Sequence, residues 1–166
     1  MAELTPKEHL QPSLLDRLTD SNPGRETDAL EQRIMSLRQL RESVIRDLEW
    51  LLNTGRLEIS RELSGFQEAG KSVLNYGIPN LSGISVTHKD SVAIERDIRQ
   101  AIVDFEPRIL PGTLKVNISL INGQTSENTL VLEIQGELWW QPLPERFYLK
   151  ATLDSELGKF KRSAEP

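Results

Sequence analysis

The stretch SVAIERDIRQAIVDFEPR, residues 91–108, decides how the chain divides between helix and sheet, because it predicts where the last helix ends. Its apolar residues recur at the spacing of one helix face: Ile94, Ile98, Ala101, Ile102 and Phe105. Pro107 removes a backbone donor and biases Glu106 away from helical dihedrals. We therefore expect the helix to stop at this point.

Glu106, Pro107 and Arg108 are candidate partner-binding residues, because a helix stop would hold a carboxylate and a guanidinium in a fixed direction. The planar fork of arginine suits bidentate pairing with a carboxylate, or with carbonyls at the end of another chain's helix. The alternative interpretation is a solvated ion pair with no partner. If the motif docks on a partner, Arg108→Ala should weaken binding but leave the isolated domain folded, because an exposed ion pair contributes only about 0–1 kcal/mol.

Upstream, a second periodic segment predicts a long helix from about residue 28 to residue 53, with Gly55 as its stop. Residues 1–28 are rich in Pro, Thr, Asn and charge, and we assign them to an N-terminal arm. Within the arm, a short helical turn places Leu14, Leu15 and Leu18 on one side. These leucines either pack on their own domain or dock on a neighbour, and the sequence does not separate the two.

Downstream of Pro111, the period changes to that of strands. Alternating apolar residues predict strands from Leu114 to Leu120, from Asn128 to Trp139, and around residues 147–153. Helices first and strands last indicate an α+β domain, with helices on one face of an antiparallel sheet of about three strands. We expect this domain to span residues 29–157, with the third strand as an edge and residues 158–166 as a tail.

Composition excludes several classes of function. The 166 residues contain no cysteine, which rules out disulfides and thiolate metal sites, and no segment has the apolar length of a membrane span. A formal charge of −5 argues against nucleic acid as a ligand. We therefore expect no cofactor, no nucleic acid and no direct membrane insertion.

Catalytic patterns are weak. The two histidines show no metal-ligand spacing, and no phosphate-binding glycine motif is present. Two carboxylate pairs were considered for glycoside hydrolysis: Asp104 with Glu106, and Glu133 with Glu137. The first pair lies beside Arg108 and the second points away from the apolar face of its strand, so neither supplies a desolvated acid. A muramidase is the alternative that we retain.

Several segments, in order, resemble one known family. The segment IRQAIVDFEPRI (98–109) is similar to the signature of the gene-25 type of phage baseplate wedge proteins, whose bacterial branch is the TssE family of type VI secretion baseplate subunits. Four further segments agree, from about Pro12 to Asp154: PSLLDRL (12–18), RDLEWLLNT (46–54), SVLNYGIP (72–79) and GELWWQPLPE (136–145). The first of these favours the secretion branch over a phage protein.

The resemblance implies a structural protein rather than an enzyme. It implies a cytoplasmic baseplate subunit at the inner face of the cytoplasmic membrane, docked on the wedge subunits TssF, TssG and TssK. Glu106, Pro107 and Arg108 would contact the wedge bundle. Strand edges would start polymerisation of the sheath subunits TssB and TssC.

Overall fold

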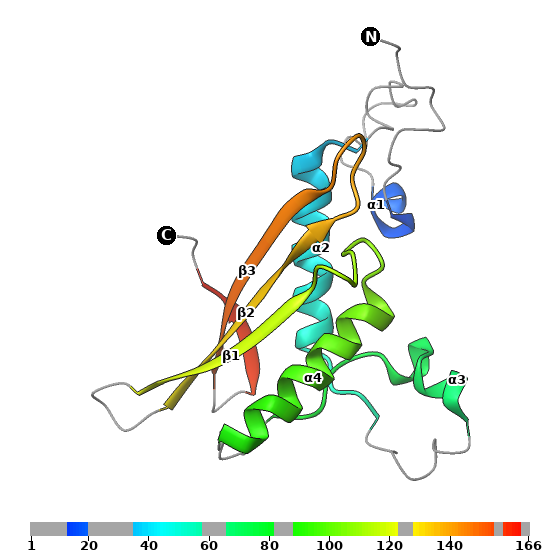
Figure 1. The fold of residues 1–166 in the computed structure, drawn as a ribbon. Helices are drawn as coiled ribbons and strands as arrows, with labels where there is room; N and C mark the ends of the chain where they lie inside the picture. The colour runs from blue at the N-terminus through cyan, green and yellow to red at the C-terminus, as the bar shows by residue number, and fades with distance from the viewer. Residues whose placement is uncertain are drawn as a thin grey trace.

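The computed structural model describes residues 13–19, 35–57, 66–81, 88–122, 128–154 and 158–163. Two long helices lie against one face of a four-stranded antiparallel sheet, and a short helix, α1 (Leu14–Leu18), lies near the upper part of the long vertical helix in Figure 1. The predicted α+β class is confirmed. Most of the predicted arm, residues 1–12 and 20–28, falls outside the described residues, as do residues 29–34 of the predicted domain.

Helix α2 (Leu37–Leu52) begins at a capping box, in which the side chains and backbones of Ser36 and Gln39 bond reciprocally. Its last residue is Leu52 and its C-cap is Asn53, within one residue of the predicted end before Gly55. The predicted start near residue 28 is wrong, because Ser36 caps the helix and its first residue is Leu37. Gly55 forms a bridge with Ile78. Helix α4 (His88–Phe105) ends where Pro107 predicted, and it begins three residues before Ser91.

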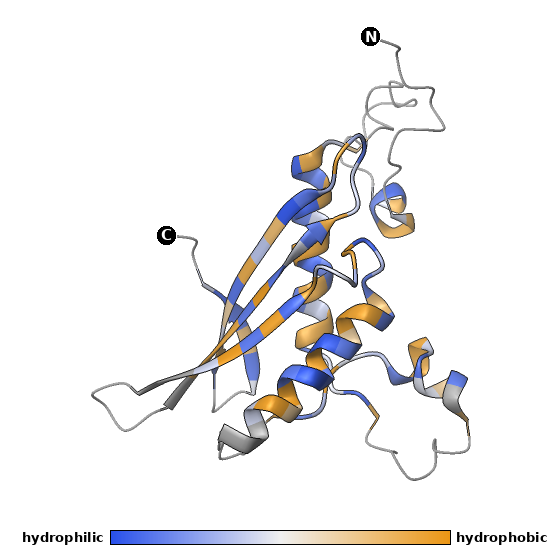
Figure 2. Cartoon of the chain, viewed as in Figure 1, coloured by the Kyte–Doolittle hydropathy of each residue, from blue (hydrophilic) through white to orange (hydrophobic). Residues whose placement is uncertain are grey.

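The sheet consists of β1 (Lys115–Asn122), β2 (Asn128–Leu138), β3 (Glu145–Asp154) and β4 (Lys159–Arg162), in that spatial order. Alternate residues of each strand face the helices, and Figure 2 shows this alternation as bands of hydrophobic and hydrophilic residues. The buried residues on this inner face are Val116, Leu130, Leu132, Ile134, Leu138, Phe147, Leu149, Ala151, Leu153 and Phe160. They pack against Leu40, Val44, Leu48, Ile98 and Ile102 of the helices.

The fourth strand corrects two expectations. We assigned residues 158–166 to a tail and β3 to an edge, but residues 159–162 pair with β3, so β1 and β4 are the edges. Phe160 is the single buried residue of β4, and its neighbours are basic and exposed. A four-residue strand with one apolar side chain carries too little periodicity to be recognised in the sequence.

In the sequence between α2 and α4, two short elements project from the body of the protein (Figure 1): α3 (Gln67–Gly70) and the 3-10 turn η3 (Val73–Asn75). Val73 and Leu74 of this segment are exposed. Gly77 fastens this segment: it has a φ of +123°, and a Cβ there would lie 2.3 Å from the carbonyl oxygen of Thr54. Two backbone bonds, Ile78 N–H to Thr54 and Arg56 N–H to Ile78, complete the junction.

Among the described residues, no helix combines the length and apolarity needed to cross a membrane.

Candidate functional site

The helix stop at Glu106 is built by backbone and side chain together. The Glu106 N–H still donates to Ile102, 2.8 Å away, while the Ile109 N–H turns back to the Glu106 carbonyl at 3.2 Å. Pro107 lies exposed at the tip of this turn. Glu106 itself is only 3% exposed, which is unusual for a carboxylate and requires an internal partner.

That partner is Arg108. Its Nε donates to one carboxylate oxygen of Glu106 at 2.7 Å and its Nη2 donates to the other at 2.5 Å, a bidentate pair. The Arg108 backbone N–H also donates to Glu106, at 3.2 Å. The carboxylate is therefore fully engaged by the residue two positions after it.

The rest of the guanidinium reaches across to α2. Its Nη1 donates to the hydroxyl of the buried Ser43 at 3.1 Å, and its Nη2 also donates to the carboxylate of Asp47. All but one of its N–H donors are thus used inside the domain, and the side chain is 22% exposed. The alternative of a solvated ion pair is therefore wrong, because the guanidinium of Arg108 clamps the end of α4 to α2. Partner binding by Glu106, Pro107 and Arg108 stays a prediction.

The backbone of Arg108 adds a third connection. Its carbonyl accepts from the Trp139 N–H at 2.8 Å, and the Leu110 N–H donates to Glu137 at 2.9 Å. Residues 108–110 therefore pair with the C-terminal end of β2. Arg108 consequently joins both long helices and the sheet at one point.

Burial works to lower the pKa of Arg108, but hydrogen bonding and charge from Glu106, and then from Asp47, outweigh it. The pKa of Arg108 therefore lies above its ordinary value. The guanidinium of Arg108 therefore stays charged across the ordinary pH range.

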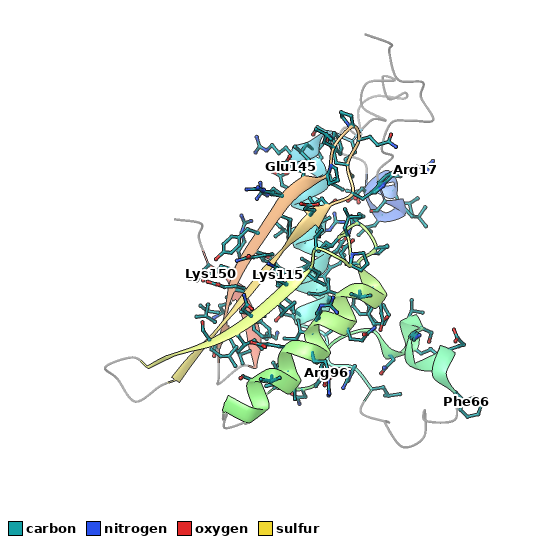
Figure 3. The ribbon with its side chains drawn as sticks, in the orientation of Figure 1. Arg17, Phe66, Arg96, Lys115, Glu145 and Lys150 are labelled. Atoms are coloured by element: carbon teal, nitrogen blue, oxygen red, sulfur yellow. The ribbon has the colours of Figure 1, made fainter. Side chains whose placement is uncertain are left out.

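The leucine turn occupies the same region. Ser13 caps α1, and Asp16 bonds Arg46 of α2 at 2.5 Å, so the polar side of α1 faces the domain. Leu14, Leu15 and Leu18 are 71%, 44% and 75% exposed. Burial tends to raise the pKa of Asp16, but hydrogen bonds from Arg46 and Ser13 hold it below the ordinary value. Figure 3 labels Arg17 on the same helix.

The two predicted segments meet at one pocket of about 270 Å³. Leu15 of α1 lines it together with Glu106 and Arg108, and the other walls are Asp47, Trp50, Leu51, Tyr76 and Phe105. The rings of Tyr76 and Phe105 meet edge to face at 5.2 Å. The structure thus brings together two sites that lie about ninety residues apart in the sequence.

Sequence reasoning did not single out Trp50 as a candidate binding residue. Trp50 is half exposed, and the Arg46 guanidinium lies 5.2 Å from its ring centroid. Its position at the edge of the apolar stripe of α2 was the one available signal. Asp47 and Ser43 were also missed, because their role depends on a residue sixty positions later.

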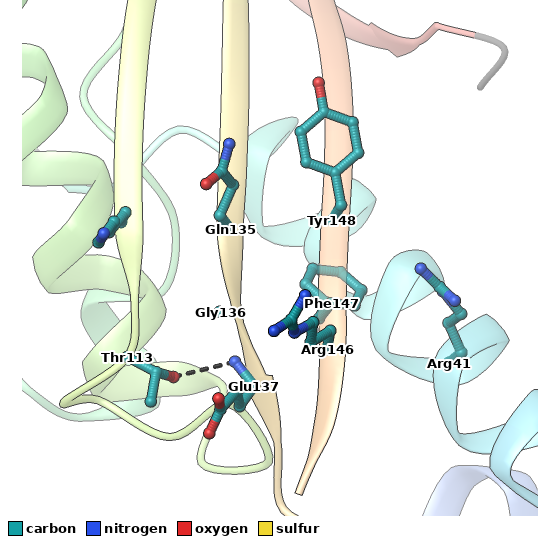
Figure 4. Close-up of a pocket in the computed structure, with 9 residues that line it drawn as sticks. Arg41, Thr113, Gln135, Gly136, Glu137, Arg146, Phe147 and Tyr148 are labelled. Carbon is teal, nitrogen blue, oxygen red and sulfur yellow. Dashed lines mark hydrogen bonds between the residues drawn. The ribbon is translucent and has the colours of Figure 1, made fainter. Parts of the chain in front are cut away.

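A second pocket, of about 510 Å³, lies over the outer, polar face of the sheet (Figure 4). It is lined by Arg41, Thr113, Lys115, Gln135, Gly136, Glu137, Arg146, Phe147 and Tyr148. The Thr113 hydroxyl accepts from the Glu137 N–H at 2.9 Å, as the dashed line shows. On the same face, Tyr148 and Lys150 contact Glu133.

The described residues offer little catalytic geometry. They contain no group of side chains suited to a metal ion. Both oxygens of Glu106 are bonded to Arg108, so this carboxylate is not available as a proton donor. Asp104, the other member of that pair, accepts from Gln100 on the exposed side of α4.

A family model described as baseplate wedge protein gp25 matches residues 38–143. Among solved structures, a candidate tail lysozyme from Geobacter sulfurreducens is 20% identical, with 71% of this chain and 93% of that chain covered and a TM-score of 0.46. Among curated proteins, none matches.

Proposed function

The chain belongs to the baseplate wedge protein gp25 family, and we propose that it docks on the wedge subunits of a type VI secretion baseplate and starts sheath polymerisation. In this proposal the wedge partners are TssF, TssG and TssK, and the sheath subunits are TssB and TssC. The resemblance of residues 12–18 to the secretion branch favours this system over a phage tail.

The convergence of α1 and the helix stop on one pocket carries the proposal. Three exposed leucines and a half-exposed tryptophan beside a charged network form the mixture typical of protein interfaces. Tryptophan is also among the residues that most often dominate binding energy. The wedge contact would therefore be made by Leu14, Leu15, Leu18 and Trp50, with the exposed Pro107 at its border.

Glu106 and Arg108 take a different role from the one that the sequence suggested. Since their polar groups are mostly bonded to each other and to α2, they hold the pocket wall in place rather than reach outward. The one remaining N–H donor of Arg108 is available to a carbonyl or carboxylate of the partner.

The direct test is co-purification of the full chain with a TssF–TssG complex. Leu14→Ser combined with Leu18→Ser should remove most of the bound complex. Leu143→Ser, at a leucine that is equally exposed on the β2–β3 connection, is the matched control and should bind normally. Equal binding by all three proteins would refute docking at this surface.

Clearing of a peptidoglycan suspension separates this proposal from a muramidase. We expect no clearing by the purified chain. Robust clearing that Glu106→Gln abolishes, with the protein still folded, would favour the enzyme instead.

A further inference from the structure

Along the C-terminal half of β3, the outer face of the sheet pairs its charges internally. The ammonium of Lys150 lies 3.6 Å from the carboxylate of Glu133, and that of Lys161 lies 3.1 Å from the carboxylate of Asp154. Both lysines therefore have a counter-charge within the protein. This part of the face offers little net charge to a partner.

Near the start of the same strand, two cations lack such a counter-charge. In the part of the chain that the structure describes, neither Lys115 of β1 nor Arg146 of β3 forms an ion pair or a side-chain hydrogen bond. Glu137 lies directly across from Arg146 in the β2–β3 register, yet no ion pair joins the two. Both cations are exposed, and Figure 3 labels Lys115 on this part of the sheet.

The two cations line the wide pocket on the outer face, together with a third. The pocket of about 510 Å³ has Lys115, Arg146 and Arg41 among its lining residues, and one carboxylate, that of Glu137. Figure 4 shows Arg146 on β3 and Arg41 on α2 beyond that strand. The pocket is therefore basic, although the whole chain carries a formal charge of −5. Such a local excess of one sign favours a partner of the other sign.

The cations are spread across the sheet and do not converge on one point. Lys115 pairs with Gln135, Gln135 pairs with Tyr148, and Arg146 precedes Tyr148 by two residues. With strands about 4.8 Å apart and a rise of about 3.3 Å per residue, the Cα atoms of Lys115 and Arg146 are about 12 Å apart. Because side chains stand roughly perpendicular to a sheet, a single small anion would touch only one of them. About four residues of extended chain would reach both.

The carboxylates of this face distinguish a peptide from a nucleic acid. A nucleic acid carries a phosphate at every step, so some phosphates would lie against Glu137. A peptide can place its carboxylates on Lys115 and Arg146 and an uncharged residue next to Glu137. The guanidinium of Arg146 also suits bidentate pairing with a carboxylate.

We propose that this pocket binds an acidic, extended segment of another protein, which crosses the strands with its carboxylates on Lys115 and Arg146. Arg41 strengthens the positive potential at the β3 side. The segment contacts side chains of the outer face, so no strand of the sheet gains a backbone partner. Glu137 disfavours a segment whose acidic residues are continuous. This site is independent of the docking surface around α1.

The test uses a fluorescently labelled peptide of alternating Glu and Ser, with its binding to the full chain measured by anisotropy at low salt. Lys115→Gln combined with Arg146→Gln should weaken binding about tenfold, because two exposed charge pairs are lost. Arg17→Gln combined with Arg96→Gln removes the same number of charges from α1 and α4 and should leave the affinity nearly unchanged. Glu137→Gln should tighten binding about threefold, which loss of the fold would not produce.

Weaker binding by the first double variant alone, with tighter binding by Glu137→Gln, supports the proposal. Equal weakening by the two double variants would show that net charge alone matters and would overturn it. Absence of binding by the unaltered chain overturns it as well. A labelled oligothymidylate that binds the same residues more tightly than the peptide makes nucleic acid the occupant, and pyrophosphate that displaces the peptide at equal concentration makes it a small anion; either result refutes the proposal.

Discussion

The Arg108 clamp and the leucine turn were predicted for the same task, yet the structure treats them in opposite ways. Arg108 points inward and bonds Glu106, Ser43 and Asp47. In α1, by contrast, no residue is buried: Leu14 and Leu18 are largely exposed, and Leu15 is half exposed where it lines the pocket. The polar motif at Glu106 and Arg108 stabilises the domain, whereas the apolar turn of α1 is exposed to solvent. A charged residue at a helix stop is therefore no sign of an exposed site until its neighbours in space are known.

The largest expected effect breaks the clamp. Arg108→Ala leaves the carboxylate of Glu106 buried without its partner, and removing one member of a buried pair costs about 3–5 kcal/mol. Since Arg108 is partly exposed, we expect a loss of about 3 kcal/mol in the free energy of unfolding, measured in urea. Arg17→Ala, at an exposed arginine of α1, is the control and should change it by less than about 0.5 kcal/mol. Comparable losses of unfolding free energy in Arg108→Ala and Arg17→Ala would contradict a stabilising role for the Arg108 clamp.

Asp47→Asn tests the α2 side of the clamp. Asp47 accepts from both Arg46 and Arg108, so the change weakens two charged hydrogen bonds while keeping the shape of the side chain. We expect a loss of about 1.5–3 kcal/mol in unfolding free energy. In a double-mutant cycle, Asp47→Asn and Arg108→Ala should be far from additive; additive losses would show that the two residues act separately.

Trp50→Ala tests the exposed side of the pocket. Because the ring is half exposed, its loss should cost less than about 1 kcal/mol in folding, while weakening the TssF–TssG complex by about 2 kcal/mol or more, as hot-spot residues do. Calorimetric titration with that complex, beside thermal melts of the free protein, separates the two quantities. A large drop in melting temperature with unchanged affinity would show that Trp50 stabilises the fold and does not bind the partner.

Acid should loosen the attachment of α1 to the domain through Asp16. The pKa of Asp16 is lowered in the folded protein, so its contribution to stability is present above the ordinary carboxyl pKa of 3.8 and is lost as the pH falls through the lower folded value. Exchange of the Arg17 and Thr19 amides should accelerate below about pH 4. Asp16→Asn should remove that pH dependence; if it persists, another group holds α1.

Most of the fold could be predicted from the sequence, because the two long helices and the first three strands have long, regular apolar periods. The end of α4 at Phe105 followed from Pro107, and the three longer strands lie within a few residues of their predicted bounds. The fourth strand was not readable, since Phe160 alone carries its burial. Part of the site could be predicted from the sequence, because local patterns marked the leucine turn and the helix stop. The bonds from Arg108 to Ser43 and Asp47 could not, because they depend on how α2 and α4 pack against each other in space.

Gly77 makes the projecting segment, residues 67–75, a suitable place to attach a marker. Its backbone fits so tightly under Thr54 that even a methyl group would collide, and Tyr76 beside it is wedged against Phe105. A spin label or gold particle attached at the exposed Val73 would therefore move with the body of the protein rather than independently of it. Such a marker would report the orientation of this subunit directly inside a large, low-resolution particle.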